Sequence, residues 1–410
     1  MRSYRRLYHL NRRHGALERW ALALPAWAGG LAVTGQGGLA RRLGRDLIAD
    51  RWFVGLRRTA WLTAWGWVPW GSPRSDPFFF PTLGLDANEC AELAEFIDRR
   101  APHRDTASVQ DARTSVYAGW IQALALEGQT IEAAHRLNRF YDEADRWLAA
   151  LERRRALAPS HRAERSTDSG AARETGDFAR SDAARALADV RRLLPADPEA
   201  WCVINGTALG LHREGDFLAH DLDIDLGVFT DSIDLQRILA AARRAAFLQR
   251  VEYETQVSLR LEKGHLMPAE HPVLVKLVHR NGIAVDLSLL HREAGRIWHG
   301  TPLHRWEHLP FGTQERILRG VPVPAPDPID QYLTEAYGDW RTPVSSFNCS
   351  AGSRNLTPFR NPLSLALMLK RLSWSLDQGD PEAYDATLGQ LEDFGCVGPA
   401  PDRCVQRDWL

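Results

Sequence analysis

Three aspartates alternate with apolar residues in the segment His220–Gly227, whose sequence is HDLDIDLG. In a β-strand, residues two apart lie on one face at a spacing of about 7 Å, so Asp221, Asp223 and Asp225 would share a face. Their carboxylates would raise one another's pKa, and a bound divalent cation would remove that cost. Oxygen ligands suit Mg²⁺ or Mn²⁺. The segment therefore predicts a magnesium or manganese site, with a solvated acidic strand as the alternative.

A single acid, Asp286, lies within the apolar segment Ile283–Leu290, which is predicted to form another strand. A buried carboxylate without a partner costs on the order of several kcal/mol, so Asp286 needs a cation nearby. That cation is either a metal ion shared with Asp223 and Asp225 or a structural arginine. In the first case the site has the three carboxylates with which phosphoryl-transfer enzymes hold a metal against the donor phosphates. Asp223, Asp225 and Asp286 are therefore the candidate catalytic residues.

The pair Gly206-Thr207 follows the predicted strand Trp201–Ile204 and opens a short predicted helix. Glycine lets a ligand approach the backbone closely, and a helix N-terminus offers free N–H groups to a phosphate. Arg213, farther along the same segment, could supply a positive fork for that phosphate. A plain turn and a surface arginine are the alternatives. Gly206, Thr207 and Arg213 are thus the candidate binding residues for a phosphorylated ligand.

Other metal and nucleophile motifs fit the sequence less well. The acidic segment is not an EF-hand loop, because that loop needs glycine at position six and glutamate at position twelve, where Leu226 and Ser232 stand. His299, His304 and His308 are close enough in sequence for a zinc site, but the proline and tryptophan between them indicate a loop. The sequence contains no serine-hydrolase, zinc-metalloprotease or P-loop motif.

The candidate residues lie in a region where predicted strands and helices alternate. The predicted strands are Trp201–Ile204, Leu222–Phe229, Val251–Leu261, Val273–His279 and Ile283–Leu290. A helix is predicted over Ser232–Phe247, and the Asn-Gly pair in Arg280-Asn281-Gly282 predicts a hairpin turn. Beyond Pro328 the pattern is mostly helical. The region is therefore predicted to be a mixed α/β domain.

The first part of the chain has a different pattern. Apolar residues recur at helical spacing over Val116–Leu126 and Thr130–Leu151, so residues 1–157 are predicted to form a helical N-terminal domain. Residues 158–182 are polar and nearly free of large apolar side chains, which is typical of a flexible linker. Residues 183–410 are then predicted to form the catalytic domain.

The composition is that of a globular protein. The chain has 410 residues, of which 44% are hydrophobic and 25% charged, so two or three domains with a substantial core are expected. Its 51 basic and 52 acidic residues give no net attraction for nucleic acid, and no nucleic-acid partner is expected. The five cysteines form no C-x-x-C pair. Reduced thiols in a cytoplasmic protein are therefore expected.

The N-terminal region raises the question of membrane contact. Arginines precede an apolar run from Trp20 to Val33 that is interrupted by proline and glycine and is too short for a comfortable transmembrane helix. No clear cleavage site follows, which does not favour a signal peptide. Helical packing is the first interpretation of residues 1–75, and peripheral attachment to the inner face of the membrane is the alternative.

The run GTALGLHREGDFLAHDLDIDLGVF resembles the glycine-rich and D-x-D-x-D signature of the LicD/fukutin-related family. The segment Val285-Asp286-Leu287 is similar to that family's third acidic strand. Tyr332–Pro343 is similar to its closing Y-L…Y-G-x-W-x-x-P element. The three motifs lie within residues 184–360, and residues 1–180 carry no resemblance. One departure is Ala219-His220, where the family often has an aromatic residue and a further aspartate.

The resemblance implies an α/β (α+β) fold of the nucleotidyltransferase type, with a mixed sheet and flanking helices. It also implies a phosphotransferase that moves a phosphorylated alcohol, such as phosphocholine or an alditol phosphate, from a CDP-linked donor to a sugar hydroxyl of a glycan or surface polysaccharide. By this resemblance Gly206 and Thr207 would hold the donor phosphates. The metal ligands would be Asp221, Asp223, Asp225 and Asp286.

Two other functions are compatible with the sequence. The same site could transfer a nucleoside monophosphate from a nucleoside triphosphate, which would release pyrophosphate instead of CMP. Alternatively, the domain could be a non-catalytic binding module of the nucleotidyltransferase fold, although the complete set of acidic residues argues against that reading.

Overall fold

The computed structural model describes residues 78, 80, 82–100, 107–157, 180–218, 221, 223–344, 347–401 and 403–410. Residues 1–75, most of the predicted linker, and Ala219, His220 and Leu222 beside the acidic segment lie outside the described residues. The membrane-contact and linker predictions therefore stay predictions. No helix in the described ranges combines the length and the apolar character needed to cross a membrane.

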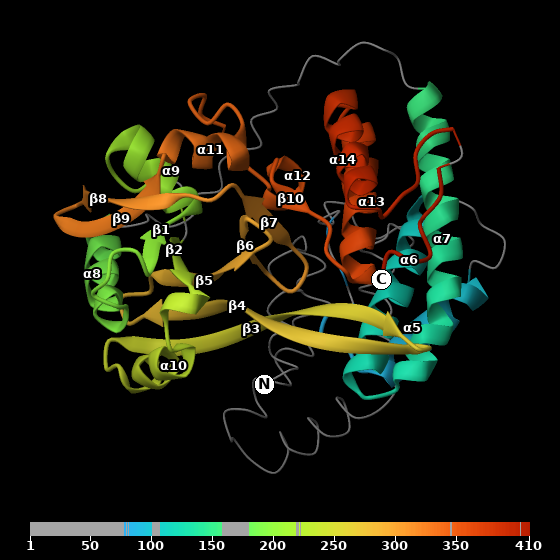
Figure 1. Cartoon of the computed structure of the whole chain (residues 1–410), viewed down its shortest axis with the longest axis horizontal. Helices are drawn as coiled ribbons and strands as arrows, with labels where there is room; N and C mark the ends of the chain where they lie inside the picture. Colours follow the sequence, from blue (N-terminus) through green and yellow to red (C-terminus); the bar gives the residue numbers. More distant parts are fainter. Residues whose placement is uncertain are drawn as a thin grey trace, which may run out of the picture. The chain divides into compact units, whose positions relative to one another are not determined.

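The chain divides into two compact units (Figure 1). The first, here called the α/β unit, comprises the described residues of Arg162–Ser258 and Ala269–Phe359. The second, called the helical unit, comprises the described residues of Met1–His161 together with Leu259–Pro268 and Arg360–Leu410. All of the candidate site residues belong to the α/β unit.

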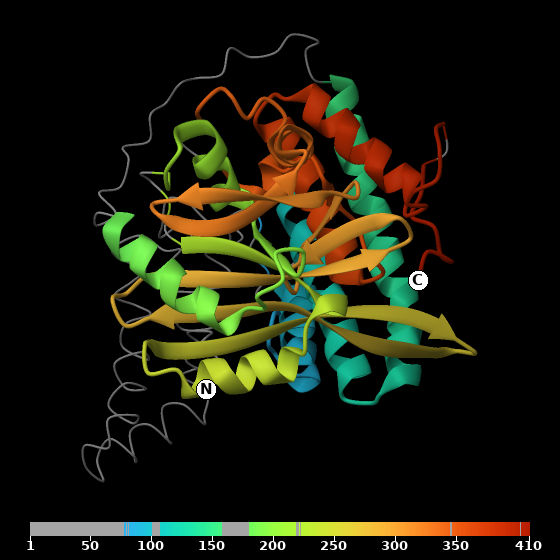
Figure 2. The same ribbon diagram turned by 60° about the vertical axis from the view of Figure 1, so that its left-hand side comes forward.

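A mixed sheet is the framework of the α/β unit (Figure 2). Its strand order is β1-β2-β5-β6-β7-β10, and the β3–β4 pair joins it because β4 also pairs with β5. Strands β2 and β5 run parallel, whereas β1 with β2 and β4 with β5 run antiparallel. This sheet, with its flanking helices, confirms the predicted mixed α/β class.

The elements of this unit have the following bounds. The strands of the main sheet are β1 Trp201–Val203, β2 Asp223–Phe229, β3 Leu248–Glu262, β4 His265–His279, β5 Ala284–Glu293, β6 Arg296–Gly300, β7 Arg305–His308 and β10 Leu356–Thr357. A two-stranded sheet consists of β8 Gly312–Leu318 and β9 Val321–Asp327. The helices are α8 Arg180–Val190, α9 Asn205–Glu214, α10 Leu235–Arg244, α11 Ile329–Tyr337 and α12 Cys349–Gly352.

The predicted strands are confirmed, with some changes at their ends. Strand β4 begins at His265 rather than Val273, because its first half is the second arm of a long hairpin with β3. The turn at Arg280–Gly282 joins β4 to β5, and the Gly282 N–H donates to the His279 carbonyl at 2.9 Å. Strands β6 to β9 were not predicted. In β9, prolines alternate with other residues. A strand of a two-stranded sheet tolerates proline, but proline is not a sequence signal for a strand, so the pattern did not predict β9.

Strand β2 separates a core face from a polar face. Ile224, Leu226 and Val228 are fully buried, and each such side chain contributes about 1.5–3 kcal/mol when it leaves water. Helix α8 packs against β2 and β5 on the sheet. Because side chains alternate along a strand, burial of these three residues turns the aspartates between them toward the opposite face.

The backbone of α9 at Gly210 closely approaches the segment that follows the helix. A Cβ atom added at Gly210 would lie 2.6 Å from the Asp216 carbonyl oxygen and 2.9 Å from the Leu218 nitrogen. The chain thus folds back over the helix on its way to β2, and only glycine leaves room for it. This packing explains why the GTALG run carries its second glycine.

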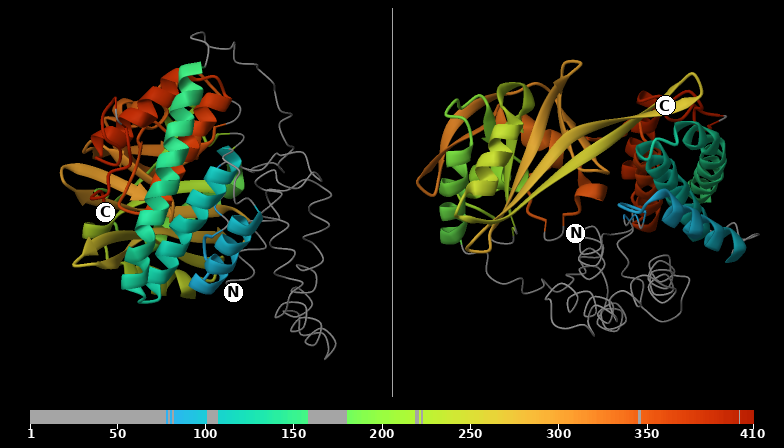
Figure 3. Two further views of the ribbon diagram at one scale, coloured as in Figure 1. Left: turned by 90° about the vertical axis from the view of Figure 1, so that its right-hand side faces the viewer. Right: turned by 90° about the horizontal axis from the view of Figure 1, so that it is seen from below.

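The helical unit consists of α5 Ala87–Arg100, α6 Ala107–Leu126, α7 Thr130–Leu157, α13 Pro362–Asp377 and α14 Pro381–Asp393 (Figure 3). Helix α13 packs against both α6 and α7. It is buried nearly all round: Leu365 and Leu369 on one face are 0% exposed and Leu367 on the opposite face is 1% exposed, so the helix needs neighbours on every side. The sequence prediction placed 183–410 in one catalytic domain, whereas these contacts group 360–410 with the N-terminal helices.

Replacing Gly210 by alanine should destabilise the protein. The added methyl group meets backbone atoms, which cannot rotate away, and such overpacking costs about 1–3 kcal/mol. Gly389, in helix α14, is the matched control, since a Cβ there meets nothing within 4 Å. Gly389→Ala should be neutral or slightly stabilising. Urea unfolding of both variants measures the difference, and an equal effect of the two substitutions would contradict this packing.

Candidate active site

Three strands bring charged residues into one row across the sheet. Asp225 of β2 is the register partner of Asp286 of β5, and Asp286 is in turn the register partner of Lys276 of β4. Neighbouring strands lie about 4.8 Å apart, and register partners extend toward the same face of a sheet. The two aspartates expected to share a site therefore do lie side by side, with a lysine next to them.

Asp225 is the most crowded acid of the row. Burial raises the pKa of Asp225 well above its ordinary value, and the negative charges of Asp223, Asp221 and Asp286 raise it further. The Gly206 N–H, in the first turn of α9, donates to Asp225 Oδ2 at 3.2 Å and acts in the opposite direction. The other three predicted metal ligands thus all lie within electrostatic reach of Asp225.

Lys276 is the positive charge beside these acids. Its Nζ lies 3.6 Å from Asp286 Oδ2. Burial, opposed by Lys276 and assisted by Asp223, raises the pKa of Asp286 to about 6. Burial opposes the charge on Lys276 as well, but Asp286, Glu254 and Asp223 hold the pKa of Lys276 above its usual value. The cationic partner of Asp286 in this structure is therefore a lysine, which neither of the two sequence alternatives named.

The predicted phosphate-binding pair lies directly against the acids. A Cβ at Gly206 would lie 2.7 Å from Asp221 Oδ2, so the missing side chain makes room for that carboxylate. The fully buried Thr207 accepts a hydrogen bond at Oγ1 from the Asp225 N–H at 2.9 Å. In this structure Gly206 and Thr207 tie α9 to β2, and their predicted contact with a phosphate stays a prediction.

Helix α11 supplies two tyrosines to the same place. The Asn205 N–H donates to the Tyr332 hydroxyl at 3.2 Å, which fixes the left-handed turn of Asn205 (φ 46°) at the start of α9. Burial raises the pKa of Tyr337 well above its ordinary value, with further contributions from Tyr332, Asp225 and Asp221. The closing motif of the sequence thus lies beside the first turn of α9 and the acids.

Two hydrogen bonds within the protein hold the guanidinium of Arg213. Its Nη1 donates to the Trp340 carbonyl at 3.1 Å and its Nη2 to Glu214 at 3.1 Å. These bonds join the end of α9 to the segment that follows α11. A role of Arg213 in phosphate binding stays a prediction, and any such role has to coexist with these two contacts.

The three histidines do not converge on a common point. His299 lies in β6 and His308 in β7, so the predicted loop is wrong for both. His308 contacts Glu335 and Asn355, whereas His304 contacts Thr301 and Ser350. Among the residues that the structure describes, no three His, Cys, Asp or Glu side chains are arranged as a metal site as they stand. The zinc alternative therefore has no support, and the aspartates would have to turn toward a common ion to bind one.

Comparison with known proteins shows the family of the middle part of the chain. Residues 200–327 match the family model described as LicD/FKTN/FKRP, nucleotidyltransferase domain. This part of the chain is a LicD-family nucleotidyltransferase domain. The match begins just before β1 and ends with β9, so it includes the whole charged row and both halves of the acidic signature. LicD-family domains generally occur in transferases. No curated protein matches the chain.

Sequence reasoning missed Lys276 and Tyr337 as residues of the LicD site. Lys276 had a signal, because it is one of only three lysines in the chain and the one basic residue before the terminal histidine of the predicted strand Val273–His279. That Lys276 lies beside Asp286 follows from the register of β4 against β5, and the sequence does not give that register. Tyr337 was part of the closing motif, but nothing in the motif indicated that it faces the aspartates.

Replacing Asp225 by asparagine should stabilise the metal-free protein at alkaline pH. The pKa of Asp225 is higher in the folded than in the unfolded chain, so stability is greatest below the unfolded value of about 3.9 and falls as pH rises toward the folded value. Asparagine cannot ionise but can still accept the Gly206 hydrogen bond. We expect the variant to exceed the wild type by roughly 1–2 kcal/mol near pH 8, with a smaller difference near pH 4.

Urea unfolding in the presence of a chelator measures this difference, and Asp216→Asn is the control of opposite sign. A hydrogen bond from Arg319 lowers the pKa of Asp216, so its charge stabilises the fold above the unfolded pKa. Asp216→Asn should therefore lose stability at alkaline pH. If Asp225→Asn also loses stability at alkaline pH, as Asp216→Asn should, then the crowding of the acids does not destabilise the folded protein.

Proposed function

We propose that this protein is a divalent-metal-dependent phosphotransferase that moves a phosphorylated alcohol from a CDP-linked donor to a sugar hydroxyl of a glycan. Phosphocholine and an alditol phosphate are the two classes of transferred group. The observation that carries the proposal is the pairing of Asp225 with Asp286 on parallel neighbouring strands of a LicD domain. Asp223 and Asp221 extend the same negative region.

The metal ion in this proposal is Mg²⁺ or Mn²⁺, held by carboxylate oxygens of Asp221, Asp223 and Asp225, with Asp286 as a further ligand or as a base. The donor set consists of hard oxygens, as these ions prefer. A cation would also offset the repulsion that raises the pKa of Asp225. When bound, it would neutralise charge on the donor pyrophosphate.

Residues of this chain would bind the donor phosphate and remove the acceptor's proton. The first turn of α9, at Gly206, presents N–H groups toward the acids and would attract a donor phosphate. Lys276, whose Nζ lies 3.6 Å from Asp286, would contact the transferred phosphate as a point charge. A carboxyl group with a pKa of about 6 suits removal of the acceptor's hydroxyl proton, which we assign to Asp286.

A screen of CDP-linked donors with Mg²⁺ or Mn²⁺ should release CMP in the presence of a glycan acceptor. Asp223→Asn should lower the rate on the order of 10³-fold or more, because it removes a ligand of the charge-neutralising cation. Asp339→Asn is the matched control, since Asp339 is exposed and bonds Thr342 Oγ1 in a loop. Release of pyrophosphate from a nucleoside triphosphate would support nucleotidyl transfer instead. A biological activity unchanged in Asp223→Asn would favour a binding module.

Lys276→Met should lower kcat about 10²-fold and raise KM for the donor. It removes a positive charge that would stabilise the transferring phosphate and keeps most of the unbranched side chain. Lys263→Met, in the exposed turn between β3 and β4, should leave both constants unchanged. Steady-state kinetics of the two variants decide the matter. Equal constants for wild type and Lys276→Met would contradict the assigned contact.

A further inference from the structure

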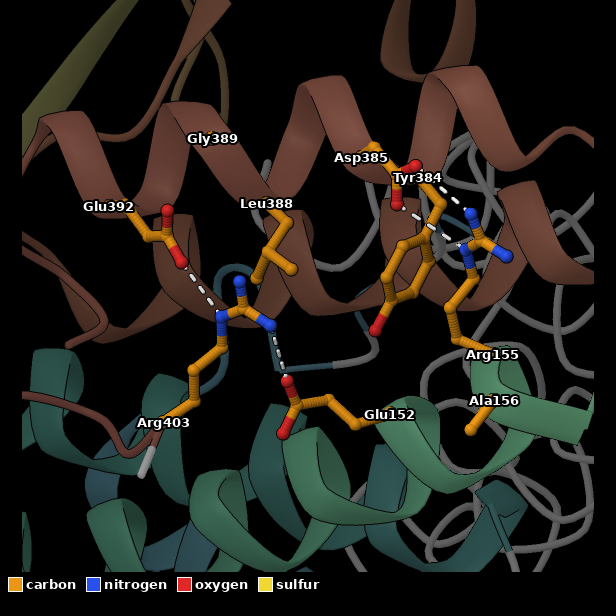
Figure 4. Close-up of a pocket in the computed structure, with 9 residues that line it drawn as sticks. All are labelled: Glu152, Arg155, Ala156, Tyr384, Asp385, Leu388, Gly389, Glu392 and Arg403. Atoms are coloured by element: carbon orange, nitrogen blue, oxygen red, sulfur yellow. Dashed lines mark hydrogen bonds and ion pairs between the residues drawn. The ribbon is translucent and has the colours of Figure 1, made fainter. Parts of the chain in front are cut away.

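A cavity of about 450 Å³ lies within the helical unit, between α7, α14 and the C-terminal segment (Figure 4). Its volume falls in the range of roughly 300–1,000 Å³ that is usual for small-molecule sites. All of its walls belong to the helical unit, and none of the phosphotransferase residues lines it. The lining residues are Glu152, Arg155, Ala156, Tyr384, Asp385, Leu388, Gly389, Glu392 and Arg403.

Ion pairs hold the charged rim of this cavity in place. Arg403 bridges the two helices, with Nε 2.7 Å from Glu392 Oε1 and Nη1 2.9 Å from Glu152 Oε1. Arg155 makes a two-nitrogen contact with Asp385 at 3.3 and 3.0 Å. Because each charge already has an opposite charge beside it, the rim does not select strongly for either an anion or a cation.

The charged side chains of the rim still have hydrogen-bond donors and acceptors that these ion pairs do not use. A guanidinium has five N–H donors, and the bonds above use two nitrogens of each arginine. A carboxylate accepts up to about four hydrogen bonds, and Glu152 and Glu392 each use one oxygen toward Arg403. The rim therefore offers a ligand both donors and acceptors on side chains held by ion pairs.

Tyr384 adds a polar atom at the base of the cavity. Its side chain is only 1% exposed, and its hydroxyl has no hydrogen-bond partner among the described residues. Figure 4 shows the ring extending from α14 into the space toward α7, with the hydroxyl at its inner end. Burial raises the pKa of Tyr384 to about 12, so the hydroxyl is neutral and able to donate. Buried hydroxyls without a partner are uncommon in folded proteins.

Gly389 opens one wall of the cavity. It lies inside α14, where glycine is less favourable than alanine, and a Cβ there would meet nothing within 4 Å. Close packing against a neighbour therefore does not explain the glycine. Its effect is to leave free space beside Leu388 and Tyr384.

We propose that this cavity binds a neutral saccharide ring. Sugar hydroxyls donate and accept hydrogen bonds at once, which suits a rim that offers both. The C–H face of the ring would lie against Leu388 and Ala156, and one hydroxyl would pair with Tyr384. An ionic ligand would meet charges that are already neutralised by the pairs of Arg155 and Arg403. This site does not depend on the proposed phosphotransferase activity.

The test uses the full chain and a panel of neutral sugars: glucose, galactose, N-acetylglucosamine, maltose and lactose. Saturation-transfer NMR should show saturable binding of at least one of them in the millimolar range. Gly389→Leu should fill the cavity and weaken that binding at least about 10-fold. Ala386→Leu, which places the same new side chain at an exposed position of the same helix, should leave it unchanged. Tyr384→Phe should weaken it about 5-fold, since it removes one hydrogen bond.

Two further measurements make the outcome decisive. Circular dichroism shows whether Gly389→Leu is folded, and Tyr384→Phe gives a second readout if it is not. Asp223→Asn should bind the sugar as the wild type does, which separates this cavity from a sugar held at the acids. Absence of binding by every sugar in the panel would overturn the proposal. So would equal binding by Gly389→Leu and wild type, or binding of inorganic phosphate or choline in place of sugars.

Discussion

Repulsion between carboxylates on β2 and β5 is the constraint around which the α/β unit is arranged. Two unit charges about 5 Å apart repel by about 3 kcal/mol at an effective dielectric constant of about 20. Asp225 and Asp286 are neighbours of this kind, with Asp223 close to both. The fold keeps them together through the burial of the apolar residues that alternate with them. Lys276 on one side and the first turn of α9 on the other reduce the repulsion without removing it.

The backbone between β1 and α9 is also shaped by the neighbouring carboxylates. Asn205 adopts a left-handed conformation, and Tyr332 of α11 bonds its N–H. Gly206 leaves room for Asp221, and Gly210 leaves room for the chain that leads to β2. Together these features hold the first turn of α9 where the Gly206 N–H donates to Asp225. Strained or crowded backbone of this kind concentrates at functional sites.

The sequence predicted the parts of this account that depend on local pattern. Strict alternation in Asp221–Gly227 indicated which residues face the core, and the Asn-Gly turn predicted the β4–β5 hairpin. The family resemblance predicted the fold of 200–327. What the sequence could not predict depends on register and packing. Lys276 reaches Asp286 only because β4 pairs with β5 in one register. Residues 360–410 pack with distant N-terminal helices because α13 is buried on nearly all sides.

The central claim is that these aspartates share one divalent ion, and the binding of Mn²⁺ to the metal-free full-length protein tests it most directly. Electron paramagnetic resonance of Mn²⁺ reports the free ion, so a titration gives both the number of sites and the affinity. The account predicts one saturable site that is competed by Mg²⁺, is lost in Asp225→Asn, and is retained in Asp339→Asn. Wild-type and Asp225→Asn proteins that take up Mn²⁺ equally, or no saturable uptake by the wild type, would contradict it.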